Sequence, residues 1–203
     1  MSPQDPPEPF EIGRRIVIWG VTGSGKTTLA RHLGNALRLP VMELDTLRHW
    51  NGWNWDDDYS DMLQAFNCWL AAHPEGWVVD GSYSAISNTY LSAVDTVIWL
   101  HLPWRTSFRR VFKRTVGRIL TRERVYHADG PRESVRQTLF SRGSILWWSI
   151  SHHGIAARRA RGRIATLPPT VRVYELRSDA EIATLLADVK KSAAEGALRS
   201  SQD

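Results

Sequence analysis

The residues with the clearest chemical role are those from Gly20 to Thr27, which read Gly-Val-Thr-Gly-Ser-Gly-Lys-Thr. They match the pattern G-x-x-x-x-G-K-[ST], in which glycines let backbone N–H groups approach phosphate oxygens closely. Lys26 is placed to reach the β- and γ-phosphates of ATP, and the Thr27 hydroxyl to coordinate Mg²⁺. The predicted nucleotide contacts are Gly20, Val21, Thr22, Gly23, Ser24, Gly25, Lys26, Thr27 and Thr28.

A carboxylate at the end of a second apolar run is the candidate metal partner of this loop. Asp80 follows Trp77-Val78-Val79, the pattern of a short buried strand that ends in an acid. An acid in this place can hold a water molecule bound to Mg²⁺. Alternatively, Asp80 accepts backbone hydrogen bonds in the turn with Gly81. Thr27 and Asp80 are thus the candidate metal residues.

Asp45 is the candidate group for a second substrate. It follows the run Val41-Met42-Glu43-Leu44, at the sheet edge where open α/β proteins bind ligands. A carboxylate there could take a proton from an acceptor hydroxyl or orient it. For a phosphate acceptor, which is already ionised, it would only orient the acceptor or bind metal. As a favoured N-cap residue, Asp45 could instead cap a helix that starts at Thr46.

A tryptophan-rich stretch, 47–55, comes next and lacks helical spacing. Its rings could stack on a ring-bearing acceptor or form a hydrophobic mouth for it. The chain has ten tryptophans, so packing of a long loop onto the domain explains the stretch equally well. The candidate acceptor contacts are Asp45, Arg48, Trp50, Trp53, Asp80, Gly81 and Tyr83.

Positive charge is concentrated between residues 105 and 163. This segment contains fifteen arginines and lysines but only three acids, which gives it a net charge of +12. Because the whole chain has a net charge of +5, the remaining residues carry −7. Arginine forks suit bidentate phosphate contacts. Arg122 and Arg124 are therefore candidate catalytic residues beside Lys26 and Asp45, with Arg118 as a nucleotide contact. Taken singly, each arginine could equally belong to a solvated helix face, and 158–163 resembles surface charge.

Alternating strands and helices must position these groups. Short apolar runs predict strands at 15–19, 41–44, 77–79, 96–102 and 171–176, and helical spacing follows Lys26, Ser60 and Ser178. Such alternation implies right-handed βαβ units and a parallel sheet, and hence an α/β fold.

The domain boundaries follow from the same pattern. About seventy residues separate the fourth and fifth strands, too many for a loop, which predicts a helical insertion over about 104–165. We expect one folded domain over 13–190, with disordered tails at 1–12 and 191–203. No stretch is long and apolar enough for a membrane span, no secretory signal precedes the domain, and a lone cysteine forms no intrachain disulfide. These features favour a cytoplasmic protein without membrane contact, and we expect a monomer or homodimer.

Several short motifs together resemble the adenylate-kinase-related P-loop kinases often labelled topology modulation proteins. They are Gly20 to Thr27, Glu43-Leu44-Asp45, Val79-Asp80-Gly81-Ser82-Tyr83, Leu102-Pro103, Arg122-Glu123-Arg124, Pro131-Arg132-Glu133-Ser134 and Leu176-Arg177-Ser178. The resemblance spans most of 14–190. It implies a three-layer sandwich of the P-loop NTPase type, with a five-stranded parallel sheet and a lid inserted after strand four. It also implies Asp45 at the acceptor pocket, Arg122 and Arg124 in the lid, and Arg177 near adenine.

Two functions fit these observations best, and a nucleotide sensor that keeps the fold without turnover is a weaker third. The first is an ATP- and Mg²⁺-dependent kinase that phosphorylates a small acceptor, either a hydroxyl compound, a nucleoside or a nucleotide. The second is a nucleotide-dependent regulator that binds DNA or a protein through the basic segment 105–163, since concentrated positive charge attracts polyanions. Nucleic acid is the less favoured partner.

Overall fold

A computed structural model describes residues 10–49, 59–83, 89–121 and 145–199. Side chains are described over the same ranges except at 48–49, 118–121, 145–153 and 196–199.

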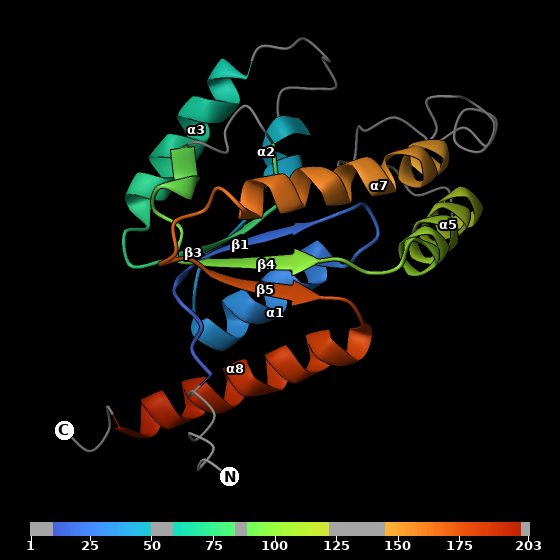
Figure 1. Ribbon diagram of the computed structural model, residues 1–203. Coiled ribbons are helices and arrows are strands. Elements are labelled where there is room, and N and C mark those ends of the chain that lie inside the picture. The colour runs from blue at the N-terminus through green and yellow to red at the C-terminus, as the bar shows by residue number, and fades with distance from the viewer. Residues whose placement is uncertain (1–9, 50–58, 84–88, 122–144, 200–203) are drawn as a thin grey trace.

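Five parallel strands form a central sheet in the order β2-β3-β1-β4-β5 (Figure 1). Ile18 of β1 pairs with Asp80 of β3 and with Ile98 of β4, so the carboxyl ends of these strands meet at one edge. The predicted α/β class and five-stranded parallel sheet are confirmed. The strands are β1 (Arg15–Gly20), β2 (Val41–Glu43), β3 (Trp77–Asp80), β4 (Thr96–Leu100) and β5 (Arg172–Leu176).

Helices cover both faces of the sheet (Figure 1). Helices α1 (Lys26–Leu37) and α8 (Asp179–Arg199) pack on one face, and α3 (Ser60–Ala72) and α7 (Ile145–Ile164) lie over the other. The short α2 (Leu44–His49) follows β2, and α5 (Trp104–Thr121) lies beyond the carboxyl end of β4. The fold is thus a three-layer sandwich.

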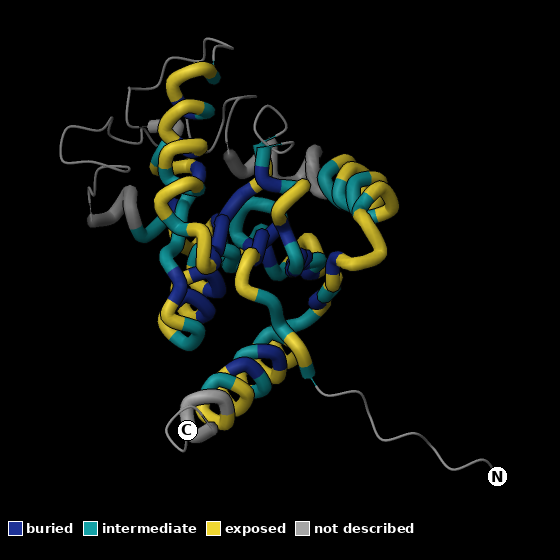
Figure 2. The backbone as a smooth tube through the Cα atoms, turned by 90° about the vertical axis from the view of Figure 1, so that its left-hand side faces the viewer, coloured by how far each residue is buried: buried dark blue, intermediate teal, exposed yellow. Residues whose placement is uncertain are grey.

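Side-chain alternation along β1 divides the core into two layers. Ile16 and Ile18 pack against α1 and α8, whereas Val17 and Trp19 pack on the side of α3 and α7. Fully burying one such side chain contributes roughly 1.5–3 kcal/mol. Figure 2 shows the buried residues concentrated in the sheet and the exposed ones on the outer helix faces. The sheet is therefore a rigid platform for the groups at its carboxyl edge.

The described part of the insertion between β4 and β5 includes α5 and α7, which pack against each other. The segment 122–144 that joins them lies outside the described residues. Pro103 precedes α5, and its carbonyl accepts the N–H groups of Thr106 and Ser107, as expected for a proline at a helix start. The fourth strand ends at Leu100, earlier than predicted.

Both ends of the domain differ from the sequence expectation. Phe10 packs against the ring of Tyr174 with centroids 5.7 Å apart, and Glu11 forms an ion pair with Arg172, so residues 10–12 join the fold. At the other end, α8 continues past Lys190 to Arg199. The expectation of disordered tails over 1–12 and 191–203 is therefore wrong for two parts of them. Residues 10–12 contact the folded domain, and residues 191–199 belong to α8. No helix within the described ranges is long and apolar enough to cross a membrane.

Candidate active site

The phosphate-binding loop takes the form predicted from its sequence, between β1 and α1. Gly23 and Gly25 have φ angles of 80° and 95°, in the left-handed region that glycine adopts readily. A Cβ atom on Gly23 would lie 2.5 Å from both the Ser107 carbonyl oxygen and Val111 Cγ2 of α5. Helix α5 thus supports the loop from behind, and only glycine fits at this contact.

Lys26 lies inside the loop that it is expected to serve. Its Nζ donates a 3.2 Å hydrogen bond to the carbonyl oxygen of Val21, and its side chain lines the pocket described below.

Thr27 and Asp80, the two candidate metal residues, are in direct contact. The Thr27 hydroxyl donates a 2.5 Å hydrogen bond to Asp80 Oδ2. Asp80 is only 6% exposed, and its Oδ1 is buried with no hydrogen-bond partner among the described residues. Burial raises the pKa of Asp80, while the charge of Lys26 and the hydrogen bond from Thr27 act in the opposite direction.

These oxygens suit Mg²⁺, which takes oxygen ligands and usually keeps several waters beside one or two carboxylates and substrate phosphates. The unpartnered Asp80 Oδ1 provides an acceptor for a metal-bound water. Across the described ranges, no cluster of three or more His, Cys, Asp or Glu could hold a metal by itself. Thr27 and Asp80 together offer the kind of oxygen ligands that Mg²⁺ prefers.

Asp45 and Tyr83, two of the predicted acceptor contacts, are in direct contact. The Tyr83 hydroxyl donates a 2.5 Å hydrogen bond to Asp45 Oδ1, joining α2 to the segment after β3. Helix α2 starts at Leu44, so Asp45 lies in its first turn. The alternative that Asp45 caps a helix starting at Thr46 is therefore wrong. Its carboxylate is exposed and held by a phenol that also packs near Tyr59, at 6.4 Å between ring centroids.

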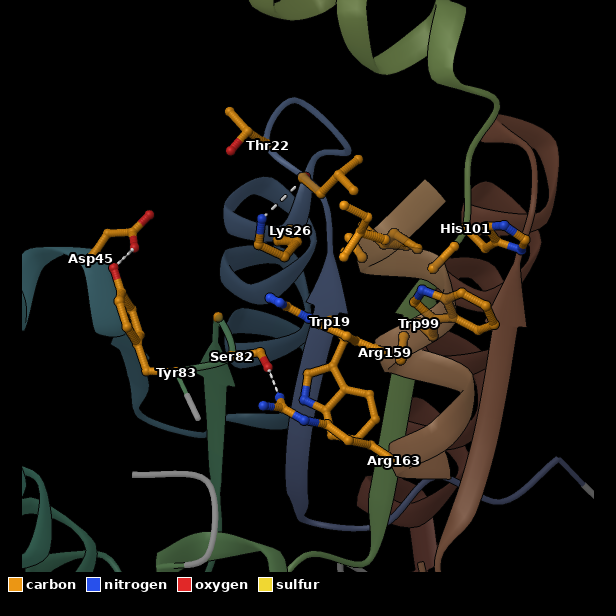
Figure 3. Close-up of a pocket in the computed structure, with 18 residues that line it drawn as sticks. Trp19, Thr22, Lys26, Asp45, Ser82, Tyr83, Trp99, His101, Arg159 and Arg163 are labelled. Atoms are coloured by element: carbon orange, nitrogen blue, oxygen red, sulfur yellow. Dashed lines mark hydrogen bonds between the residues drawn. The ribbon is translucent and has the colours of Figure 1, made fainter. Parts of the chain in front are cut away.

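A pocket of about 410 Å³ brings these groups together (Figure 3). The phosphate loop and Lys26 lie at one end, with Asp45 and Tyr83 on one side. Trp19 and Trp99, register neighbours on β1 and β4, line its base. The lining residues include Gly20, Val21, Thr22, Gly81, Ser82, Leu100, His101, Ile155, Arg159 and Arg163.

Two arginines of α7 enter this pocket, which the sequence did not suggest. Arg159 and Arg163 are four residues apart and so share one helix face. Arg163 Nη1 donates a hydrogen bond to Ser82 Oγ. Arg163 is half-buried, so interpreting 158–163 as surface charge is wrong for this side chain, whereas Arg159 is exposed and also lines the pocket. Arg158 is exposed and does not line the pocket. In the sequence, the four-residue spacing of Arg159 and Arg163 predicts that they share a helix face with the small residues Ala156 and Ala160.

Arg110 links the phosphate loop to α5 and α8. Arg110 of α5 donates a 3.2 Å hydrogen bond to the Ser24 carbonyl and pairs at 2.5 Å with Asp179 in the first turn of α8. Ser178 caps the start of α8, because its Oγ accepts the Glu181 N–H at 3.2 Å. Glu181 Oε2 in turn accepts the N–H of Arg177 at 2.8 Å.

The predicted nucleotide contact Arg177 is exposed after β5. Its Nε lies 3.0 Å from Glu175 Oε1, which also meets His101 Nδ1 at 2.7 Å. The hydrogen bond from Arg177 is the main cause that lowers the pKa of Glu175. This pairing leaves the rest of the Arg177 guanidinium at the surface, and its contact with adenine stays a prediction.

Several predicted site residues cannot be placed in the pocket. Trp50, Trp53, Arg122 and Arg124 lie outside the described residues. Arg48 and Arg118 belong to α2 and α5, but their side chains lie outside the described set. Their roles in acceptor binding, catalysis and nucleotide binding stay predictions.

Comparisons with known proteins identify the fold. No family model matches the chain, and no curated protein matches it. Among solved structures, shikimate kinase from Bacteroides thetaiotaomicron is 12% identical, with a TM-score of 0.52 and coverage of 88% of this chain and 97% of that one. A kinase candidate from Chloroflexus aurantiacus j-10-fl is 15% identical, with a TM-score of 0.52 and coverage of 89% and 98%. A sugar kinase from Janibacter sp. HTCC2649 is 17% identical, with a TM-score of 0.47 and coverage of 90% and 92%. The resemblance to topology modulation proteins rests on the short motifs alone, whereas the solved structures show that the chain has the α/β fold of shikimate kinase.

Proposed function

We propose that the protein is an ATP-dependent kinase that transfers the γ-phosphoryl group of Mg-ATP to a small-molecule acceptor. The observation that carries this proposal is the pocket in which Lys26, Asp45 and two arginines of α7 surround one space beside the phosphate loop. The loop supplies a nucleotide site, and the opposite side of the pocket supplies a carboxylate for a second substrate. The acceptor is a hydroxyl compound, a nucleoside or a nucleotide, and an exposed carboxylate held by Tyr83 favours a hydroxyl.

The phosphate side of the pocket would stabilise the charge that spreads over the transferred group. Backbone N–H groups of the loop and the start of α1 bind the phosphate oxygens. Lys26 would give up its hydrogen bond to the Val21 carbonyl and bind the β- and γ-phosphates instead. Arg159, on the facing helix, would neutralise charge on the γ-phosphoryl group. Thr27 and Asp80 would hold Mg²⁺ beside the nucleotide, where the ion would supply positive charge against that of the phosphates.

The acceptor side would position and deprotonate the attacking group. The acceptor hydroxyl oxygen forms a bond to the γ-phosphorus, and the bond between that phosphorus and the β–γ bridging oxygen breaks. The hydroxyl proton passes to the Asp45 carboxylate, which Tyr83 holds in place. The products are a phosphate ester and ADP, so atoms and charge balance.

The test is ADP release from Mg-ATP by the purified protein, with and without a mixed library of alcohols, nucleosides and nucleoside monophosphates. We expect at least one acceptor to stimulate release in the wild type. Lys26→Ala should abolish it and weaken nucleotide binding, whereas Asp45→Asn should abolish acceptor-dependent release while ATP still binds. A library that stimulates no release would contradict the proposal.

The competing regulator function has one supporting observation. Helix α5 carries exposed basic side chains, Arg105, Arg109, Lys113 and Arg114, that do not line the pocket. Binding of DNA through them would depend steeply on salt, with log affinity falling by about 0.9 per unit of log salt for each phosphate contacted. Such a dependence in the absence of any acceptor-stimulated turnover would favour the regulator over the kinase.

A further inference from the structure

We propose that the acceptor carries an anionic group, a carboxylate or a phosphate, which binds Arg163 at the end of the pocket away from the phosphate loop. This inference rests on the proposed kinase function and names the class of its acceptor. The acceptor would thus have a hydroxyl near Asp45 and an oxyanion near Arg163.

The charge of the pocket is the first argument. Its described lining has three cationic side chains, Lys26, Arg159 and Arg163, against the single carboxylate of Asp45. Lys26 lies within the phosphate loop and serves the nucleotide. Two guanidinium groups therefore remain for anions, and the phosphoryl group in transfer occupies one end of the pocket only.

The positions of the two arginines divide their roles. Four residues along α7 correspond to a rise of about 6 Å. In Figure 3, Arg159 lies on the side of the pocket nearer Lys26, and Arg163 lies farther from the loop, beside Ser82 and Trp19. Arg159 can therefore meet the transferred phosphoryl group, whereas Arg163 is displaced toward the acceptor end.

Arg163 is already held in a geometry that can accept an anion. Its Nη1 donates to Ser82 Oγ, a neutral oxygen that orients the guanidinium without neutralising it. Ser82 lies next to Tyr83, the residue that binds Asp45. Because a guanidinium offers five N–H donors in a planar fork, the remaining donors can bind an oxyanion in a bidentate manner.

An unsatisfied donor lies beside Arg163. Trp19 is 2% exposed, and its indole Nε1 meets no hydrogen-bond partner among the described residues, although the side chain lines the pocket. The neighbouring Tyr90 hydroxyl interacts with this N–H, which acts to lower the pKa of Tyr90, but the two groups are not aligned for a hydrogen bond. Leaving a buried donor unpaired costs about 1–3 kcal/mol, which an oxygen of a bound anion could recover. The indole N–H and the guanidinium would then bind the same group.

The experiment measures phosphorylation of matched acceptors by the full chain and compares the acceptors with one another. Hydroxy acids form one arm, phosphorylated alcohols and nucleoside monophosphates a second, and the corresponding neutral amides, alcohols and nucleosides a third. We expect acceptors of one anionic class to have a higher kcat/KM than their neutral counterparts. Which class this is tells whether the bound anion is a carboxylate or a phosphate. In Arg163→Gln this preference should fall tenfold or more, approximately the loss expected for a charge-assisted hydrogen bond. Arg163→Lys should restore part of it.

Arg158→Gln is the matched control, since Arg158 is exposed on the same helix and outside the pocket lining. It should leave both kcat/KM and the preference unchanged. Neutral acceptors that react as well as anionic ones would overturn the inference. So would an Arg163→Gln variant that loses activity toward neutral and anionic acceptors by the same factor.

Anion binding without turnover separates a failure of this inference from a failure of the kinase proposal. With Mg-ADP saturating, so that the phosphate loop is filled, inorganic phosphate and acetate are titrated while the melting temperature is followed. Stabilisation that disappears in Arg163→Gln and persists in Arg158→Gln supports the anion site even if no acceptor is phosphorylated. Stabilisation that persists in Arg163→Gln, or none in the wild type, overturns it.

Discussion

The hydroxyl of Thr27 donates a 2.5 Å hydrogen bond to Asp80 Oδ2, joining the first turn of α1 to the end of β3. The pair lies beside Lys26, whose positive charge partly offsets the burial that raises the pKa of Asp80. A buried carboxylate with one unpartnered oxygen is unfavourable for the ligand-free fold and useful for holding a hydrated metal ion.

We therefore predict that Asp80→Asn stabilises the ligand-free protein at pH 7. Asparagine can still accept the Thr27 hydroxyl but carries no buried charge. A gain of about 1 kcal/mol would raise Tm by about 2–4 °C in a protein of this size, and the further stabilisation by Mg-ADP should shrink. Thermal melting with and without Mg-ADP measures both effects. Glu75→Gln, at an exposed carboxylate, is the control and should gain nothing.

The same substitution has a defined pH dependence. Because the folded pKa of Asp80 is raised, the folded protein binds this proton more tightly than the unfolded chain does. The contribution of Asp80 to stability is therefore full below its unfolded pKa and is lost as the pH rises through the folded pKa. The Tm gain of Asp80→Asn should shrink as the pH falls below neutrality. A gain that stays constant at every pH would show that charge burial is not its cause.

Tyr83→Phe should lower kcat for the acceptor by about tenfold or more while nucleotide affinity stays the same. The change removes the donor to Asp45 Oδ1, and a hydrogen bond to a charged group contributes about 1.5–3 kcal/mol. Steady-state kinetics with the stimulating acceptor and calorimetry with ADP measure the two quantities. Tyr174→Phe removes a hydrogen bond to the Glu11 carbonyl, away from the pocket, and should change stability without changing kcat. Equal kcat in Tyr83→Phe and wild type would remove Tyr83 from the site.

Gly23→Ala should weaken both folding and nucleotide binding. The new Cβ would press on the Ser107 carbonyl and Val111, and alanine is strained at a φ of 80°. We expect a loss of about 1–3 kcal/mol in stability and of tenfold or more in ADP affinity. Gly154→Ala is the matched control, because no atom of the described residues crowds its Cβ position within α7. It should stabilise the protein by about 0.5–1 kcal/mol. An unaffected ADP affinity in Gly23→Ala would show that α5 does not shape the loop.

Ser178→Ala should lower Tm by about 2–4 °C, corresponding to about 1 kcal/mol for the loss of an N-cap. The Glu181 N–H would lose the oxygen that it now meets at 3.2 Å. Ser192→Ala, at an exposed position within α8, should leave Tm unchanged or slightly raised, since alanine favours the helix. Melting curves of both variants and the wild type measure these Tm values. A Ser178→Ala variant with the Tm of the wild type would mean that the cap contributes nothing to stability.

The sequence was sufficient for the parts of the site that follow from local chain geometry. The motif from Gly20 to Thr27 could be placed because a strand precedes it and a helix follows it. Asp80 could be placed near Thr27 because parallel strands end at a common edge, and the register of Ile18 with Asp80 confirms this. The extension of α8 to Arg199 was also within reach, since the residues beyond Lys190 include several alanines, which favour helices.

What could not be predicted depends on how distant segments pack. The spacing of Arg159 and Arg163 shows that they share a helix face, but no local signal says whether that face meets solvent or a pocket. Trp19 and Trp99 have the appearance of buried strand residues, which they are, and only tertiary structure shows that their rings also line a cavity. Leu44 begins a helix where the sequence suggested the end of a strand, which moves Asp45 into the first turn.

The two walls of the pocket come from separate stretches of chain. Lys26 and Thr27 belong to the loop and α1, near the start of the domain, whereas Arg159 and Arg163 belong to the helix that returns from the insertion. By the roles proposed above, Arg159 faces the transferred phosphoryl group and Arg163 the acceptor. Exchange of Arg163 alone would therefore leave Lys26, Thr27 and Arg159 in place, which makes this one position of α7 suitable for engineering a new acceptor specificity.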